Sequence, residues 1–225
     1  MHPTTTPRVK ICCIGTKEEA LLAIRFGAAA IGLVAKMPSG PGPIPDERIA
    51  EIARTVPPPI ATFLLTSETD AAAIIKHQQR VMTNTIQLVD ELKIGTYAQI
   101  REALPGVKLV QVIHVIDERS VTEAIRISHY VNALLLDSGN PNLAIKELGG
   151  TGRTHNWELS REIRECIAIP LFLAGGLNPE NVRAAVELVQ PFGIDICSGV
   201  RTNGKLDQVK LSNIFKTIAL YQKSL

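Results

Sequence analysis

The stretch PLFLAGGLNPENVRAAVELVQPFGIDICSGV, residues 170–200, decides how this chain is expected to fold. It holds two apolar runs, residues 170–174 and 193–197, and each leads into small residues, Gly175-Gly176 and Ser198-Gly199. When a buried parallel strand ends at glycine, the backbone can approach an anion closely and its amides can point at it. The two runs predict neighbouring strands that share a phosphate pocket. Each turn taken alone is equally compatible with an ordinary tight turn.

A helix is expected between these two runs. Asn178 suits the capping position and Pro179 the first helical position, so the helix is predicted over residues 179–189. The unpaired amides and positive dipole of its first turn would add to the phosphate pocket.

The same alternation of short apolar runs and longer helical stretches extends over the whole chain. The predicted strands cover residues 9–12, 30–34, 60–65, 85–88, 108–115, 133–136, 170–174 and 193–197. The predicted helices cover residues 17–26, 46–55, 69–80, 97–104, 118–128, 157–167, 179–189 and 209–221. Eight strand-helix units with strands apolar on both faces favour a single-domain (β/α)8 TIM barrel of the α/β class over an open sheet. The domain is predicted to span residues 1–225, with residues 1–8 a short polar N-terminal extension.

Composition excludes several functional classes. With 225 residues, 45% of them apolar, the chain can bury a large core, and its net charge of +2 argues against a nucleic-acid partner. The four cysteines, at positions 12, 13, 166 and 197, lack metal-ligand spacing and are expected to be reduced thiols. The first residues do not resemble a signal peptide, and no apolar run is long enough to span a membrane. We therefore expect a cytoplasmic protein without membrane contact.

Polar residues at the strand ends are the candidates for chemistry, because the active site of such a barrel lies at the carboxyl ends of its strands. They are Lys10, Cys12, Gln87, Asp137 and Asp195. Simpler interpretations exist: a strand-end cysteine such as Cys12 is often a small buried core residue, and Asp137 before Ser138-Gly139 also fits a turn.

Several segments carry a resemblance to one enzyme family. They are Lys10-Ile11-Cys12, Leu136-Asp137-Ser138, residues 149–154 with Asn156-Trp157, residues 173–182, and Asp195 with Ser198-Gly199-Val200. In this order they resemble the phosphoribosylanthranilate isomerase family of tryptophan biosynthesis, whose members carry out an Amadori rearrangement. The glycine-rich segments occur in other phosphosugar barrels as well, whereas the joint order is highly specific.

The resemblance implies an acid and a base and no cofactor or metal. Cys12 would be the base that removes the C2 proton of the ring-opened Schiff base, and Asp137 the acid that protonates the furanose oxygen. Neighbouring Lys10 would favour the thiolate of Cys12, and desolvation would keep the proton on Asp137. The expected substrate is a phosphorylated sugar, and the expected assembly is a monomer or homodimer. The residues expected to bind substrate or its phosphate are Lys10, Gly150, Gly152, Gly175, Gly176, Asp195, Ser198, Gly199 and Arg201.

Four positions depart from the family pattern, all at strand ends. Cys13 replaces the glycine after the family's cysteine, the loop at 37–43 lacks the arginine that pairs with the anthranilate carboxylate, Val89 replaces a histidine, and Arg201 a glutamate. Lys36 or Arg201 is a candidate to supply the missing positive charge. The Gly-Pro loop at 39–45 is expected to bound or gate the mouth, and the loop at 149–154 to close with Arg153 and Thr154 near the phosphate.

These departures leave two alternatives to the isomerase. One is a divergent paralogue that binds a phosphorylated sugar or nucleotide without turnover. The other is an isomerase of a related phosphoribosyl amine that lacks the aromatic carboxylate.

Overall fold

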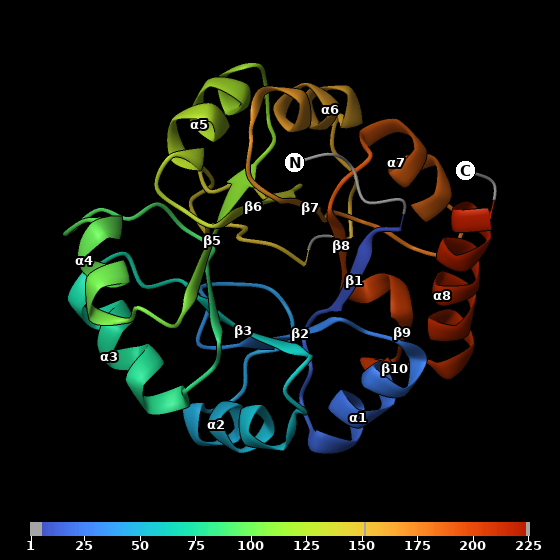
Figure 1. Ribbon diagram of the computed structural model, residues 1–225, viewed down its shortest axis with the longest axis horizontal. Helices are drawn as coiled ribbons and strands as arrows, with labels where there is room; N and C mark the ends of the chain where they lie inside the picture. Colours follow the sequence, from blue (N-terminus) through green and yellow to red (C-terminus); the bar gives the residue numbers. More distant parts are fainter. Residues whose placement is uncertain (1–5, 151, 224–225) are drawn as a thin grey trace.

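The computed structural model describes residues 6–150 and 152–223 and contains eight parallel strands closed into a barrel, with an outer ring of helices (Figure 1). The barrel strands are β1 (Arg8–Ile11), β2 (Ala30–Val34), β3 (Ala61–Thr66), β4 (Thr85–Leu88), β5 (Lys108–His114), β6 (Ala133–Asp137), β7 (Leu171–Leu173) and β8 (Gly193–Ile196). The helices are α1 (Lys17–Phe26), α2 (Asp46–Thr55), α3 (Ala71–Val81), α4 (Tyr97–Ala103), α5 (Arg119–Ser128), α6 (Trp157–Cys166), α7 (Val182–Val189) and α8 (Gln208–Lys223). Strand β8 pairs with β1, so the sheet has no open edge. The predicted (β/α)8 barrel is confirmed.

The strands are apolar on both faces because each face packs against a different layer. Every residue of β2, β4, β6 and β8 is buried. Outward-facing side chains such as Ile31 and Leu64 belong to the core between sheet and helices. Inward-facing side chains fill the barrel, where the rings of Phe63 and Phe172 meet edge to face at 5.9 Å. This packed interior separates a cavity at the barrel mouth from a second cavity at the amino ends of the strands, which is lined by residues such as Arg8, Lys108 and Phe172.

Most helix starts follow the capping residues in the sequence. The side chain of Thr16 caps α1, that of Asp70 caps α3, and Thr96 forms a capping box with Gln99 at α4. The predicted start of the seventh helix at Pro179 was wrong.

Helix α7 begins three residues later, at Val182. The side chain of Asn178 explains the difference: its Oδ1 accepts hydrogen bonds from the backbone amides of Glu180 and Asn181, both at 3.0 Å. These bonds close a turn that takes the place of a first helical turn.

The chain after β8 adds small elements that the sequence pattern did not indicate. A 3-10 turn, η1 (Ser198–Val200), leads into a hairpin of β9 (Arg201–Thr202) and β10 (Lys205–Leu206) before α8. At the other end, Arg8 of the predicted extension already belongs to β1, and residues 1–5 lie outside the described residues. The domain bounds of 1–225 stay a prediction. In the part of the chain that the structure describes, no helix is long and apolar enough to cross a membrane.

Candidate active site at the barrel mouth

A cavity lies at the carboxyl ends of the barrel strands. Its enclosed volume is about 80 Å³. Of the predicted site residues it is lined by Cys12, Asp137, Gly150, Gly152, Gly175, Gly176, Asp195 and Ser198. Residues at the ends of β1, β6, β7 and β8 therefore converge on one space with Gly149, Gly150 and Gly152.

Cys12 follows β1 and its side chain points into the barrel. It is only 5% exposed, and its backbone amide donates to the carbonyl of Ile196 in β8 at 2.8 Å. A Cβ atom added to Gly32 would lie 2.8 Å from Cys12 Sγ and 3.0 Å from Lys10 Nζ, so the thiol and the ammonium group lie against the same glycine.

Asp137 is the last residue of β6 and is 8% exposed. Burial raises the pKa of its carboxyl, because removal from water disfavours the ionised form. Gly149 packs directly on it: a Cβ at Gly149 would lie 2.8 Å from Asp137 Oδ2, and the backbone there has a φ of 138°. The carboxyl can therefore hold a proton beneath the loop that follows its own strand.

The glycine turns after β7 and β8 pack against each other so closely that side chains are excluded. A Cβ at Gly199 would lie 2.0 Å from the carbonyl oxygen of Leu177, and one at Gly176 would lie 2.7 Å from the backbone of Arg153. Gly152 packs on the same side, where its Cβ would lie 3.8 Å from Ser198 Oγ. The turns thus present backbone and one hydroxyl to the cavity, as an anion site requires.

Two loops cap the mouth and touch each other. A Cβ at Gly150 would lie 2.5 Å from Pro41 Cδ, and one at Gly40 would lie 3.3 Å from the carbonyl of Gly149. Ser39 Oγ also donates to the carbonyl of Lys146 at 2.6 Å. The Gly-Pro loop thus bounds the mouth. Arg153 lies at the surface, where its guanidinium pairs with the carboxylate of Glu147.

Lys10 lies deeper than predicted. It is fully buried, is absent from the described residues that line the cavity, and its Nζ donates to Asp195 Oδ2 at 2.9 Å. Burial alone would lower the pKa of Lys10, but the Asp195 carboxylate outweighs it and raises the pKa. The physical reason for its depth is strand periodicity: Lys10 precedes the inward-facing Cys12 by two residues and occupies the layer beneath it.

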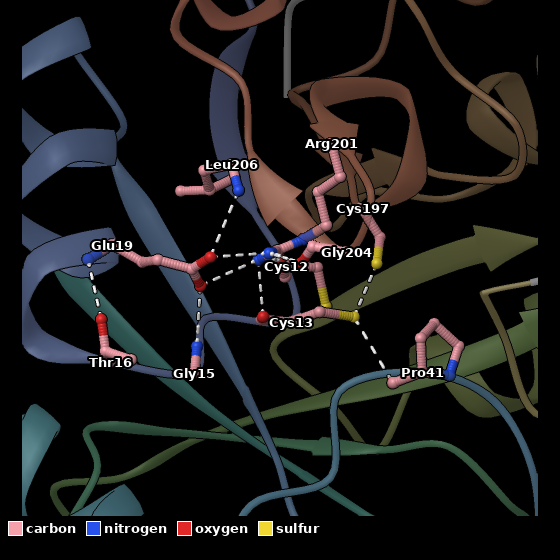
Figure 2. Close-up of polar contacts among 10 residues, drawn as sticks. All are labelled: Cys12, Cys13, Gly15, Thr16, Glu19, Pro41, Cys197, Arg201, Gly204 and Leu206. Carbon is pink, nitrogen blue, oxygen red and sulfur yellow. Dashed lines mark hydrogen bonds and ion pairs between the residues drawn. The ribbon is translucent and has the colours of Figure 1, made fainter.

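Arg201 is also placed away from the predicted substrate site. Its Nη1 donates to Glu19 Oε1 at 2.8 Å, and its Nη2 donates to the carbonyl oxygens of Cys13 at 2.6 Å and Cys12 at 3.3 Å (Figure 2). Arg201 follows η1 and not β8 directly. Its side chain lies against Glu19 of α1 and against the backbone that follows β1. It holds protein backbone and does not line the cavity among the residues described.

The sequence did not lead us to predict one contact between side chains and two buried hydrogen-bond acceptors that lack a partner in the part of the chain that the structure describes. Cys197, which lines the cavity, has its Sγ 2.6 Å from Cys13 Sγ. The buried atoms Gln87 Oε1 and Asp195 Oδ1 have no hydrogen-bond partner among the described residues. The sequence does contain a signal for the thiol contact, because both cysteines follow strands that become neighbours once a barrel closes.

No histidine is among the described residues that line the cavity. His155 packs against Gly175, and burial lowers its pKa to about 4, so its ring is neutral. Within residues 6–150 and 152–223, no group of three His, Cys, Asp or Glu side chains is arranged to hold a metal ion.

Comparison with known proteins gives one consistent result. A family model described as N-(5'-phosphoribosyl)anthranilate (PRA) isomerase matches residues 9–217. The N-(5'-phosphoribosyl)anthranilate isomerase 2 of Methanosarcina mazei is 34% identical over 208 residues, covering 92% of this chain and 91% of that protein. The crystal structure of phosphoribosyl anthranilate isomerase from Thermotoga maritima superposes with a TM-score of 0.78 at 30% identity, covering 97% of this chain and 100% of the other. A structure of this enzyme in complex with reduced 1-(o-carboxyphenylamino)-1-deoxyribulose 5-phosphate has a TM-score of 0.76 at 29% identity, with the same coverage.

Proposed function

Because this chain belongs to the N-(5'-phosphoribosyl)anthranilate isomerase family, we propose that its barrel mouth carries out the Amadori rearrangement of phosphoribosylanthranilate in tryptophan biosynthesis. The observation that carries the proposal is that Cys12 and Asp137 line one cavity, while the glycine turns after β7 and β8 lie between their strands in the barrel order. A base, an acid and a phosphate cradle are the parts that this reaction needs.

The proton transfers follow from the surroundings of the two side chains. Asp137, whose pKa is raised by burial, gives its proton to the furanose oxygen, and the ring opens to a Schiff base. Cys12 as thiolate then removes the proton at C2, and the resulting enolamine converts to the ketone. The ammonium group of Lys10 lies beneath the cavity floor, against the same glycine as the thiol.

We assign the phosphate of the substrate to the turns that exclude side chains. Gly176, Ser198 and Gly199 would hold it, with Gly152 closing from the loop above and Gly150 and Gly175 shaping the approach. Asp195 Oδ1 and Gln87 Oε1 are acceptors suited to the sugar hydroxyls, because both are buried without a partner among the described residues.

Substrate entry requires the capping loops to part. The enclosed space of about 80 Å³ is well below the 300 to 1,000 Å³ that is usual for small-molecule sites. The contacts of Pro41 with Gly150 and of Ser39 with Lys146 must open for each turnover.

The test is an assay of the purified protein with phosphoribosylanthranilate, with growth rescue of a strain that lacks this isomerase. Cys12→Ser should lower kcat by about 100-fold or more, because the hydroxyl is a far weaker base at this position. Full activity of this variant would exclude the thiol as base, whereas rescue by the wild type alone would support both reaction and base. Cys166→Ser, at an exposed cysteine, is the matched control.

One observation favours a second substrate. Among the described residues that line the cavity there is no lysine or arginine, so the anthranilate carboxylate has no charged partner in this loop arrangement. Arg201 is engaged by Glu19, which leaves exposed Lys36 as the candidate cation. A phosphoribosyl amine without the aromatic carboxylate would need no such cation. Comparing kcat/KM for the two substrates decides between them.

The remaining assignments belong to the same proposal. We place the reaction in the cytoplasm, since the family is biosynthetic and the four cysteines are free. Whether the chain acts as a monomer or a homodimer stays a prediction that sedimentation analysis would decide.

A further inference from the structure

Two thiols meet at the seam where β8 closes the barrel onto β1. Cys13 follows β1, Cys197 follows β8, and Cys197 Sγ lies 2.6 Å from Cys13 Sγ (Figure 2). Both cysteines are free thiols. The contact joins residues 184 positions apart, so the closure of the barrel brings the pair together.

The backbone of Cys13 is locked in place. Its φ is 60°, a left-handed conformation that glycine adopts most easily. The Arg201 guanidinium holds its carbonyl at 2.6 Å, and Glu19 holds that guanidinium in turn (Figure 2). This clamp fixes the direction in which the Cys13 side chain leaves the backbone.

The Cys13 side chain is confined from the other side by the Gly-Pro loop. A Cβ at Gly42 would lie 2.8 Å from Cys13 Cβ, and Cys13 Sγ contacts the carbonyl oxygen of Pro41 at 3.6 Å. With the clamp behind it and the loop above it, the sulfur is directed at Cys197.

The two thiols differ in character and in access. The Cys13 thiol lowers the pKa of Cys197, helped by the charge of Arg201 and opposed by burial. Hydrogen bonds with the Cys12 and Cys197 thiols, together with burial, raise the pKa of Cys13. Cys197 is also the partly exposed member, whereas Cys13 is buried although it lines the same cavity, so a small oxidant that enters the mouth meets the Cys197 thiol.

We propose that Cys13 and Cys197 form a reversible redox site, in which hydrogen peroxide converts the two thiols to a disulfide and thereby switches off turnover. The Cys197 thiolate attacks one peroxide oxygen, forms an S–O bond and breaks the O–O bond, which leaves a sulfenic acid and releases hydroxide. Cys13 sulfur then attacks Cys197 sulfur, the S–S bond forms as the S–O bond breaks, and the proton of Cys13 leaves with the oxygen as water. The hydroxide takes up a proton from solvent, so two thiols are oxidised by two electrons while one peroxide becomes two waters.

The effect on turnover rests on the proposed function, whereas the thiol chemistry does not. Cys13 directly follows Cys12, the proposed base, and Cys197 directly precedes Ser198 of the phosphate turn. A disulfide of about 2.05 Å requires the sulfurs to approach by about 0.5 Å from their present contact. The bond ties the residue after the base to the residue before the phosphate turn, and catalytic groups tolerate displacements of only about 0.5 Å, so we expect turnover to fall.

The experiment treats the full-length wild-type protein with hydrogen peroxide and follows three signals. Intact mass should fall by the mass of two hydrogen atoms, titratable thiols should fall from four to two, and peptide mapping should join Cys13 to Cys197. Isomerase activity should fall at least tenfold and return with dithiothreitol. A disulfide that includes Cys12, or four thiols that survive treatment, would overturn the proposal.

Variants separate this site from oxidation of Cys12 itself. Cys13→Gly places at a positive φ the residue best suited to it, and Cys197→Ser removes the other sulfur, so one remains informative if the other fails to fold. Neither should form the disulfide, and each should resist reversible inactivation when compared with its own untreated activity. Cys166→Ser should respond like the wild type. Equal inactivation of wild type and Cys13→Gly contradicts the switch. A mapped Cys13–Cys197 disulfide in a protein without isomerase activity counts against the proposed function alone.

Discussion

The two halves of the barrel mouth are built by different means. The half after β7 and β8 is made of backbone. Its glycines are packed so tightly that a Cβ added to Gly199 would lie 2.0 Å from the carbonyl oxygen of Leu177. The half formed by β1 and β6 is made of side chains, Cys12 and Asp137, beneath loops that touch each other. Backbone amides can bind a phosphate group, which is the same in every phosphosugar. Side chains and loops determine the reaction and which substituent on the sugar is accepted. Three of the four departures from the family pattern, at Cys13, the loop at 37–43 and Val89, lie outside the backbone half, whereas Arg201 follows β8.

Asp137→Asn breaks the side-chain half and should have the largest effect on turnover. Loss of the proton donor should lower kcat by about 100- to 10,000-fold. The free energy of unfolding of this variant should, in contrast, rise at neutral pH. Since the pKa of Asp137 is raised in the folded protein, its contribution to stability is complete below the ordinary value of 3.8 and is lost as pH rises through the raised value.

The asparagine removes this cost of ionisation, so the free energy of unfolding at pH 7 should be higher in the variant than in the wild type. Urea unfolding of both proteins at pH 4 and pH 7 measures this difference in the free energy of unfolding. Unchanged turnover would remove Asp137 from the mechanism, and an equal loss of stability at both pH values would contradict the buried, proton-holding carboxyl.

Gly199→Ala breaks the backbone half. The added methyl group collides with the carbonyl of Leu177, so we expect a loss of about 2 to 4 kcal/mol in the free energy of unfolding and a KM raised by about 100-fold. Inorganic phosphate should protect the wild type against thermal unfolding and lose this effect in the variant. Gly106→Ala is the matched control, since a Cβ there has no heavy atom within 4 Å. Retained protection by phosphate would place the anion elsewhere.

Arg201→Ala sharpens the comparison at the boundary between the halves. Removal of the guanidinium frees the Cys12 and Cys13 carbonyls and leaves Glu19 without its partner, which should cost about 1.5 to 3 kcal/mol of stability. Because Arg201 positions the backbone of the base and does not touch substrate, kcat should fall about tenfold while KM changes little. A rise in KM with unchanged kcat would restore Arg201 to the substrate site.

Ser39→Ala tests the capping loops and should have the smallest effect. It deletes one hydrogen bond to the Lys146 carbonyl, worth about 0.5 to 1.5 kcal/mol, and so eases opening of the mouth. We expect a change in kcat of about threefold or less and a faster rate of substrate entry in stopped-flow binding. Ser67→Ala deletes a bond of the same kind to the Lys36 carbonyl, away from the cavity lining, and should leave entry unchanged.

The sequence predicted those features that depend on local patterns. The order of strands and helices followed from apolar periodicity, and Gly175-Gly176 and Ser198-Gly199 indicated the tight turns after β7 and β8, whereas phosphate binding at these turns stays a prediction. Lys10 lies two residues before Cys12, so strand periodicity also indicated its depth, although its polarity suggested a contact with substrate at the strand end.

Features that depend on side-chain direction or distant contacts were not predictable in this way. The direction of Arg201 depends on η1 and on Glu19, which is 182 residues away. The start of α7 depends on whether Asn178 caps a helix or closes a turn, and the same residue types serve both. The contact of Cys13 with Cys197 required the strand order and the register of the closed barrel as well as the two residue types.

The β1–β8 seam also governs when the molecule becomes an enzyme. Lys10 faces Asp195 in the register, and the amide of Cys12 bonds to Ile196, so the two ends of the chain must meet before the base has its surroundings. Contacts of such long sequence separation form late and slowly in folding. A ribosome-bound chain that has not yet released β8 therefore has no assembled catalytic centre, and activity arises only when synthesis is nearly finished.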